Sequence, residues 1–223
     1  MPNICYINGS PKGNNSSSFF FISKLKEEMD ETSYNKFYIH AASSIHSRTI
    51  QDDFKTVDNA DILIIAFPLY IYSVPGSLMR FLEDYYTHLK TLNTKKDIRV
   101  YAVVNCAFPD PTINNEAVRV LKNFCARLNL NWRFAVSIGA GGLVGAAKKI
   151  KFMDNLCSKV YDSLYDINND IETKSEAPVE NRYAAPSSSM LLYGRIGKTN
   201  WVRAAMSNGL SEEDLYKKPY VSK

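Results

Sequence analysis

The sequence predicts an α/β fold: a doubly wound, five-stranded parallel sheet with helices on both faces, followed by a C-terminal helical extension. Five short runs rich in β-branched and aromatic residues recur along the chain, and most are followed by a loop and a helical pattern. Two of these runs, 62–66 and 100–104, are apolar at consecutive positions, which is typical of strands covered on both faces. Strands that alternate with helices imply right-handed crossovers and therefore a parallel sheet.

The individual elements follow from the spacing of the apolar residues. The predicted strands are Ile4–Ile7, Lys36–His40, Asp61–Phe67, Ile98–Cys106 and Trp132–Ile138. Helical periodicity predicts helices over 16–30, 77–89, 115–128 and 152–167. The second of these helices opens after Pro75 and Gly76, in agreement with the usual signals at a helix start.

The chain is expected to divide into a core over residues 1–171 and a linker with C-terminal extension over 172–223. The stretch from Glu172 to Ser189 is polar and contains two prolines, which favours a surface linker. Beyond it, 190–193 and 201–206 are too apolar for a free tail, so we expect this segment to pack on the core or on a second subunit. The pair Asn208-Gly209 predicts the end of a helix.

Composition narrows the function classes. The chain has 223 residues, of which 45% are hydrophobic, and a formal net charge of +4. The lysines and arginines are scattered, which argues against a nucleic-acid-binding protein. The four cysteines lie too far apart for a zinc or iron–sulfur site, so no metal is expected. With no signal-like start and no membrane-length apolar run, we expect a cytoplasmic protein with reduced thiols.

The most informative segment is the loop directly behind the first predicted strand. It reads Asn8-Gly9-Ser10-Pro11-Lys12-Gly13-Asn14-Asn15-Ser16-Ser17-Ser18. Its glycines let the backbone bend and approach a ligand, while the Asn and Ser side chains and the free N–H groups of the following helix supply hydrogen-bond donors. The segment lacks the Walker spacing, which disfavours nucleotide hydrolysis. It predicts a metal-free phosphate site, with an ordinary strand-to-helix turn as the alternative.

Two further loops share the same edge of the predicted sheet, where ligands of such sheets bind. The loop Pro68–Gly76 is stiffened by two prolines, and Tyr70 and Tyr72 offer flat rings with polar ends. The loop Asn105–Asp110 follows the fourth strand, and Gly139–Gly142 follows the fifth. One phosphate cradle beside rigid aromatic loops suits a flat heteroaromatic ring with a single phosphate, which favours FMN over a dinucleotide. The alternatives to a ligand site are that Tyr70 and Tyr72 are ordinary surface residues and that Gly141-Gly142 forms a plain turn.

These motifs resemble a known family, the flavodoxin-like NAD(P)H-dependent FMN reductases and related flavodoxin-family oxidoreductases. The resemblance depends on Asn8 to Lys12 with the serines 16–18, on Ala60 to Ile62 leading into Pro68 to Gly76, and on Gly139 to Gly142. It covers about the first two-thirds of the chain and implies a flavodoxin-like fold. Some relatives carry a cysteine cluster for an iron–sulfur centre, but 41–48 contains no cysteine. An iron–sulfur flavoprotein is therefore disfavoured.

The resemblance implies which residues bind FMN. Around the phosphate it places Ser10, Lys12, Asn14, Asn15, Ser16, Ser17 and Ser18. Along the isoalloxazine ring it places Pro68, Leu69, Tyr70, Ile71, Tyr72 and Ser73, and at the ring's far side Asn105, Cys106, Ala107, Gly141 and Gly142. It implies no catalytic side chain, because the flavin carries the chemistry.

The activity implied is an NAD(P)H-dependent oxidoreductase in which hydride passes from NADPH or NADH to flavin N5 and then to a small acceptor such as a quinone or a flavin. Lys12 and Arg48 are the candidate contacts to the 2′-phosphate of NADPH. The resemblance and the apolar extension together favour a homodimer.

Other interpretations stay open. A flavodoxin-type electron-transfer protein would bind the same cofactor without nicotinamide turnover, but the net positive charge favours the enzyme. A protein that binds another phosphorylated ligand is the third candidate. Cys106 is interpreted as a small packing residue near the site, and His40, His46 and His88 as structural or surface residues.

Overall fold

The computed structural model describes residues 1–47, 50–92, 97–147, 151–187, 190–218 and 220. It consists of two compact units, Met1–Pro186 and Ser187–Lys223. Because the positions of the two units relative to one another are not determined, each is described by itself.

The first unit is built on a six-stranded parallel sheet in the order β2-β1-β3-β4-β5-β6. The strands are β1 (Asn3–Asn8), β2 (Asn35–His40), β3 (Ile62–Pro68), β4 (Arg99–Asn105), β5 (Asn131–Ile138) and β6 (Arg182–Ala184). The five predicted strands are all present, but the prediction of a five-stranded sheet was wrong. The sixth strand lies within the stretch expected as a linker.

The sixth strand is too short to leave a sequence pattern. Its three residues pair in parallel with 136–138 of β5, and just before it the side chain of Asn181 accepts a hydrogen bond from the Ala135 amide at 2.9 Å. Pairing with the edge of β5 thus gives strand conformation to a segment that is too short to be predicted from propensity.

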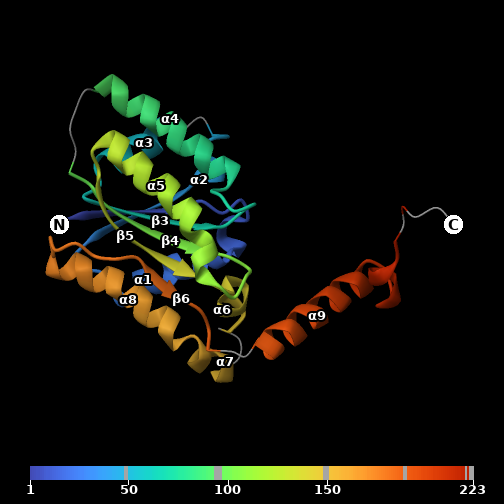
Figure 1. The fold of residues 1–223 in the computed structure, drawn as a ribbon. Coiled ribbons are helices and arrows are strands. Elements are labelled where there is room, and N and C mark those ends of the chain that lie inside the picture. Colours follow the sequence, from blue (N-terminus) through green and yellow to red (C-terminus); the bar gives the residue numbers. More distant parts are fainter. Residues whose placement is uncertain (48–49, 93–96, 148–150, 188–189, 219, 221–223) are drawn as a thin grey trace. The chain divides into compact units, whose positions relative to one another are not determined.

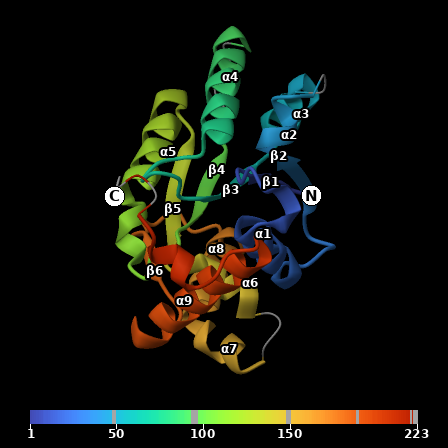
Figure 2. The same ribbon diagram turned by 90° about the vertical axis from the view of Figure 1, so that its right-hand side faces the viewer.

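Helices cover both faces of the sheet (Figure 1). One face carries α2, α3, α4 and α5, and the other carries α1, α6, α7 and α8, an arrangement that Figure 2 shows end on. Their bounds are α1 (Ser17–Glu28), α2 (Ala41–Ser44), α3 (Ile50–Asp58), α4 (Gly76–Leu92), α5 (Asn115–Leu128), α6 (Gly141–Ala147), α7 (Lys151–Leu156) and α8 (Ser158–Thr173). The described residues also form the short 3-10 helices η1 (Gly13–Asn15), η2 (Pro111–Asn114) and, in the second unit, η3 (Glu213–Tyr216).

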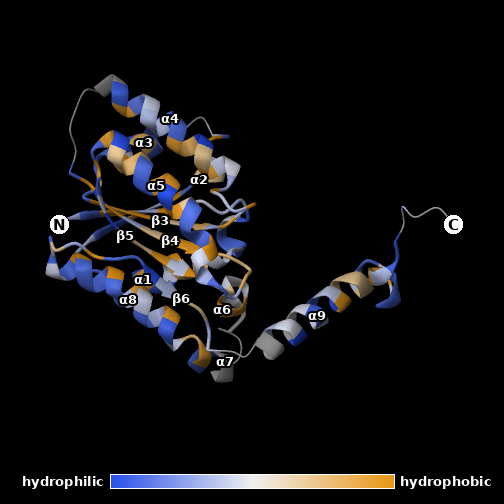
Figure 3. Ribbon diagram, viewed as in Figure 1, coloured by the Kyte–Doolittle hydropathy of each residue, from blue (hydrophilic) through white to orange (hydrophobic). Residues whose placement is uncertain are grey.

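The strands alternate their side chains between two hydrophobic cores. In β3, Leu63 and Ile65 pack in the core under α3 to α5, whereas Ile62 and Ile64 pack in the core under α1 and α8. The central strands are accordingly mostly apolar (Figure 3): β3 is apolar throughout, and β4 is apolar between Arg99 and Asn105 apart from the Tyr101 hydroxyl. The consecutive apolar runs in the sequence therefore have the predicted cause, burial on both faces.

The observed helices differ from the predicted ones: α2 and α6 were not predicted, and α6 begins at Gly141, where a loop or turn was expected. The expected helix over 152–167 is two helices, α7 and α8, because Cys157 between them leaves helical geometry with φ −96° and ψ 1°. Helix α3 escaped prediction because it is short and mostly polar, with only Phe54 and Val57 buried. Helix α5 spans the predicted 115–128.

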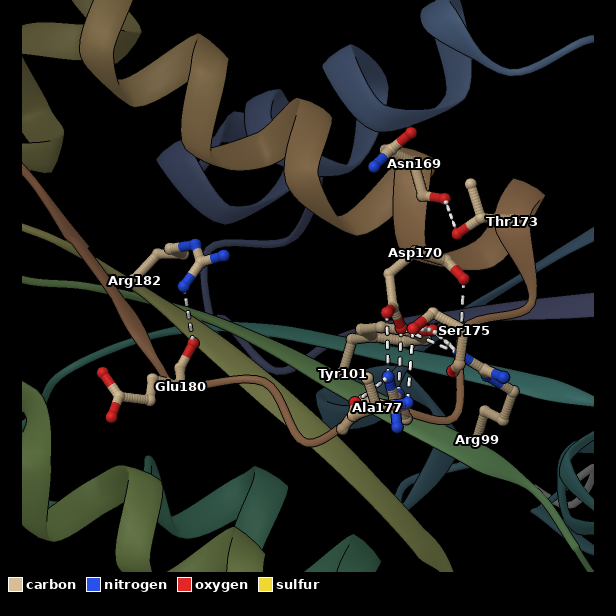
Figure 4. A network of polar contacts seen from close by, with 10 residues as sticks. Arg99, Tyr101, Asn169, Asp170, Thr173, Ser175, Ala177, Glu180 and Arg182 are labelled. Atoms are coloured by element: carbon tan, nitrogen blue, oxygen red, sulfur yellow. Dashed lines mark hydrogen bonds and ion pairs between the residues drawn. The ribbon is translucent and has the colours of Figure 1, made fainter.

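A buried network of charged side chains joins α8 to the amino ends of β4 and β5 (Figure 4). Asp170 of α8 accepts hydrogen bonds from Tyr101 at 2.7 Å, from Arg99 at 2.8 Å and from Arg133 at 2.8 and 2.9 Å. The two guanidinium groups also donate to the carbonyls of Ser175 and Ala177, both at 2.9 Å. Burial by itself would raise the pKa of Asp170, but hydrogen bonds from Arg133 and Tyr101 outweigh it and hold the pKa below its usual value.

The second unit consists of α9 (Met190–Ser207) and η3. Gly209, with φ +74°, ends the helix as predicted, and the Leu210 amide donates to the Ala205 carbonyl at 3.0 Å. Trp201 is 70% exposed, and the expected packing of this segment on the core or on a second subunit stays a prediction. None of the helices in the described part of the chain combines the length and the apolar character that crossing a membrane requires.

Candidate functional site

A cavity of about 220 Å³ opens at the carboxyl ends of β1, β3 and β4. This is the point where the order of the strands reverses, because the chain winds from β1 outward to β2 and then back across to β3. The cavity is lined by Ser10, Lys12, Asn15, Ser16, Ser17, Ser18, Pro68, Leu69, Tyr70, Asn105, Cys106, Ala107 and Gly142. All of these are residues that the sequence analysis placed around FMN. The structure thus gathers three predicted loops around one cavity, while their contact with a cofactor stays a prediction.

Five predicted site residues lie outside this lining: Asn14, Ile71, Tyr72, Ser73 and Gly141. The side chain of Asn14 accepts a hydrogen bond from the Tyr38 hydroxyl at 2.9 Å, so it braces the loop from outside. Gly141 packs behind the cavity against Asn105. The second candidate contact to NADPH, Arg48, lies outside the described residues.

The first loop is held in place by Asn8, the last residue of β1. Its side-chain amide donates to the Gly13 carbonyl and to the Tyr38 hydroxyl, both at 3.0 Å, and its side-chain oxygen accepts from the Ser10 amide at 3.0 Å. Burial raises the pKa of Tyr38, so its hydroxyl stays protonated as a donor to Asn14. The loop shape is therefore fixed by side chains that do not line the cavity.

The serines at the start of α1 have different roles. The Ser16 hydroxyl donates to the Gly13 carbonyl at 2.6 Å and accepts from the Phe19 amide at 3.1 Å, so it is the N-cap of the helix. Ser18 is buried, and its hydroxyl accepts from the side-chain amide of Asn105 at 3.0 Å. Because the Phe19 amide is bonded to Ser16, the amides of Ser17 and Ser18 are the first-turn N–H groups left as natural donors to an anion.

The two glycines of this loop serve packing more than ligand approach. A Cβ at Gly9 would lie 2.5 Å from Leu78 of α4 and 3.0 Å from Phe67, so the glycine lets α4 close on the loop. Gly13 has φ +55°, and its Cβ would lie 3.3 Å from the ring of His40. Neither glycine lines the cavity.

The second loop forms a tight hairpin beside the cavity mouth. Tyr70 and Ser73 exchange two backbone hydrogen bonds of 3.0 Å each, and between them Ile71 and Tyr72 have φ +48° and +59°. Positive φ at both central positions defines a type I′ turn, which normally requires Gly or Asn. A β-branched residue in this conformation is strained, and Ile71 is 96% exposed, so no packing compensates.

An aromatic pair spans the second and third loops. The rings of Tyr72 and Phe108 are nearly parallel, with centroids 6.3 Å apart and planes at 17°. Both side chains are about half exposed. Tyr72 is among the predicted site residues, whereas Phe108 is not. Phe108 could have been predicted as a site residue, because it is an aromatic residue three positions after the end of β4.

The far wall of the cavity depends on a close approach between two loops. A Cβ at Gly141 would lie 2.8 Å from Cβ of Asn105, so only glycine permits this contact. Ala140 just before it has φ +51°, and its amide donates to the Phe108 carbonyl at 2.6 Å. Cys106 is buried, and burial raises the pKa of its thiol, so it remains a neutral packing side chain.

A second, larger cavity of about 810 Å³ lies at the opposite, amino edge of the sheet. Its lining carries charges of both signs: Asp61, Asp97 and Glu176 against Arg99, Arg133 and Lys174. The two arginines belong to the Asp170 network, which explains them structurally. Ligands of open parallel sheets bind at the carboxyl ends of the strands. The smaller cavity lies at that edge and is therefore the better candidate for a ligand site, although the other cavity is larger.

The charges around the smaller cavity favour an anion. Among the described residues of its lining, Lys12 is the one cation and none is a carboxylate. Among the described residues, no cluster of three or more His, Cys, Asp or Glu side chains is arranged to hold a metal ion. The donors available are therefore amides, hydroxyls and one ammonium group, which suit a phosphate.

Comparisons with known proteins agree with the fold. The family model described as a flavodoxin-like fold matches residues 2–104. Among solved structures, the apo form of the NADH:FMN oxidoreductase EMOB has a TM-score of 0.53 and 17% identity, over 80% of this chain and 92% of that chain. Smu.1420 from Streptococcus mutans has a TM-score of 0.50 and 11% identity, over 75% of this chain and 99% of that chain.

A third structure is the NAD(P)H:quinone oxidoreductase from Methanothermobacter marburgensis, with a TM-score of 0.50 and 10% identity over 63% of this chain and 86% of that chain. A search of curated proteins gave no match. At these identities the solved structures speak for the fold alone. The predicted flavodoxin-like fold is confirmed, because the flavodoxin-like family model matches residues 2–104 and the architecture of EMOB is similar.

Proposed function

We propose that the protein is an FMN-dependent oxidoreductase that transfers reducing equivalents from NADPH or NADH to a small acceptor such as a quinone or a flavin. The observation that carries the proposal is the cavity at the strand switch point, where the start of α1, its serines and Lys12 meet and where no described lining residue is a carboxylate. The named activities of EMOB and of the Methanothermobacter marburgensis protein support the same reaction class.

The residues present fit the phosphate end of FMN. The first-turn amides of α1 would donate to the phosphate oxygens, joined by the hydroxyl of Ser17 and the ammonium group of Lys12. Each hydrogen bond to a charged group contributes roughly 1.5–3 kcal/mol. The cavity of about 220 Å³ is smaller than the roughly 300–1,000 Å³ of typical ligand pockets. It therefore suits the phosphate and the sugar-alcohol chain, with the ring system at the open mouth.

The residues at the mouth fit a flat ring. Pro68, Leu69 and Tyr70 line one side, and Asn105 to Ala107 line the other. The nearly parallel rings of Tyr72 and Phe108 stand on the two loops that flank the mouth, and both are exposed enough to stack on a ligand.

The chemistry of the reaction would come from the bound flavin, which accepts a hydride and passes electrons on. The residues of this chain would bind and orient it. In the loop 68–73, Pro68 has no N–H and the amides of Leu69, Tyr70 and Ser73 donate to backbone carbonyls, so the amides of Ile71 and Tyr72 would be the donors to the ring edge. Lys12 would offset the phosphate charge. The neutral thiol of Cys106 would contribute packing, since burial raises its pKa.

The visible spectrum of the purified protein tests the proposal. Protein incubated with FMN and desalted should retain a flavin absorption band, and anaerobic addition of NADPH or NADH should bleach it. Ser17→Glu places a carboxylate in the anion site and should abolish flavin retention. Ser163→Glu adds the same charge on the exposed face of α8 and should retain flavin like the parent.

Each other outcome is informative. Flavin that binds but stays oxidised after addition of either nicotinamide would favour an electron-transfer protein over a reductase. A protein that takes up no FMN would overturn the proposal. The homodimer that we also propose would appear as twice the 25.2 kDa chain mass in light scattering.

A further inference from the structure

His40, a histidine that the sequence analysis treated as structural or surface, stands directly beside the phosphate-binding loop. It is the last residue of β2, and the strand register pairs it with Asn8, the last residue of β1. Parallel strands present their carboxyl ends at one edge, so His40 reaches the same edge as the loop that follows β1. A register shift of one residue would turn its ring to the opposite face of the sheet.

The ring of His40 makes a hydrogen bond with each nitrogen. Nε2 lies 2.8 Å from the Ser10 carbonyl, and Nδ1 lies 2.6 Å from the Ser43 hydroxyl. Because a carbonyl oxygen can only accept, Nε2 must carry the proton and donate to Ser10. In the neutral ring Nδ1 then accepts from Ser43, which fixes both the tautomer and the ring orientation.

This contact fixes the peptide group at the turn of the loop. The Ser10 carbonyl accepts from the Gly13 amide at 3.1 Å and from His40, so a donor is present for each of its two lone pairs. Ser10 is only 1% exposed, so water cannot easily replace a lost donor. The ring also lies against Gly13, whose added Cβ would meet it at 3.3 Å.

We propose that His40 is a positioning residue for phosphate recognition: it ties the Ser10 carbonyl to β2 and so keeps that negative dipole out of the anion site. The inference rests on the proposed function, because it assigns a role in binding the FMN phosphate. Ser10 and Lys12 line the cavity on either side of the peptide that His40 holds. Without His40 the carbonyl would be held by the Gly13 amide alone, and a rotation of the peptide toward the phosphate would bring repulsion between the carbonyl dipole and the anion.

The test compares FMN with riboflavin, which has the same ring system but no phosphate. Dissociation constants for both are measured by quenching of flavin fluorescence. In His40→Ala the Kd for FMN should rise about tenfold while the Kd for riboflavin stays within about twofold of the parent. His40→Gln can still donate to Ser10 and should bring the FMN Kd back to within about threefold of the parent.

His46→Ala is the matched control. His46 is an exposed histidine six residues further on, and its Nδ1 lies 2.7 Å from the carbonyl of Ala42 in the preceding helix α2. This variant should bind both flavins like the parent. Thermal melting of each variant without ligand shows whether it is folded.

The outcomes separate the two proposals. A parent protein that binds neither flavin would reject the proposed function and, with it, the role of His40. If the parent binds FMN but His40→Ala leaves the ratio of the two dissociation constants unchanged, the proposed function survives and His40 has no positioning role. An equal loss of FMN and riboflavin affinity would mean general destabilisation and would also reject it.

Discussion

Replacing Asp170 by Asn should cost the protein a large part of its stability. The carboxylate is the only acidic group in a network with two guanidinium groups among the described contacts, and its side chain is 7% exposed. The substitution keeps the shape but changes the local charge from +1, two arginines less one aspartate, to +2. It also turns one acceptor oxygen into an NH₂ group that faces the arginine donors.

The expected loss follows from the burial. Removing one partner of a buried ion pair destabilises a protein by about 3–5 kcal/mol, because the remaining charge stays buried without compensation. Urea unfolding of the parent and of Asp170→Asn, followed by circular dichroism, measures this difference. Asp166→Asn on the same helix is the control, because its pair with Arg182 is 40% exposed and should contribute no more than about 1 kcal/mol.

The pH dependence gives a second measure of the same network. The folded-state pKa of Asp170 is below its usual value, so its contribution to stability is present above about pH 4, the ordinary range of an aspartate, and fades as the pH falls through the lowered pKa. The free energy of unfolding of Asp170→Asn should lack this decrease at low pH. A loss below about 1 kcal/mol, equal to that of the control, would refute the assignment of Asp170 as the central acceptor.

The remaining predictions concern the two site loops and the thiols. Gly141→Ala places a Cβ 2.8 Å from Asn105 and should lower the stability by about 1–3 kcal/mol, whereas Gly142→Ala, with no atom within 4 Å of its Cβ, should melt like the parent. Ile71→Asn should raise the free energy of unfolding in urea by about 1 kcal/mol, because Asn tolerates φ +48°; a decrease would contradict the strain. All four cysteines are buried, so a thiol reagent such as DTNB should label them quickly only after unfolding, and fast labelling of the native protein would disagree.

The sequence revealed most of the fold because buried strands and amphipathic helices leave periodic patterns. Helix α5 and the five longer strands were predictable for this reason. Strand β6 was not, because its three residues owe their conformation to pairing with β5. The split between α7 and α8 at Cys157 likewise leaves no break in the apolar spacing.

The site was predictable where the residue types themselves carry chemistry. Glycine, serine and asparagine after a strand point to an anion site, and tyrosines between prolines point to a rigid wall. What the sequence could not show is which residues hold these loops in shape. Asn8 at the end of β1 and Tyr38 and His40 in β2 make hydrogen bonds to the loop that follows β1. Which residues meet there follows only from the register between the two strands.

The Asp170 network has a consequence for how this chain can change. It locks four segments together at one end of the strands, whereas the candidate site occupies the other end. Stability and ligand choice are thereby assigned to different ends of the same sheet. Substitutions in the exposed loops beside the mouth, such as at Ile71 or Phe108, leave the Asp170 network untouched, so these loops can change without loss of the architecture.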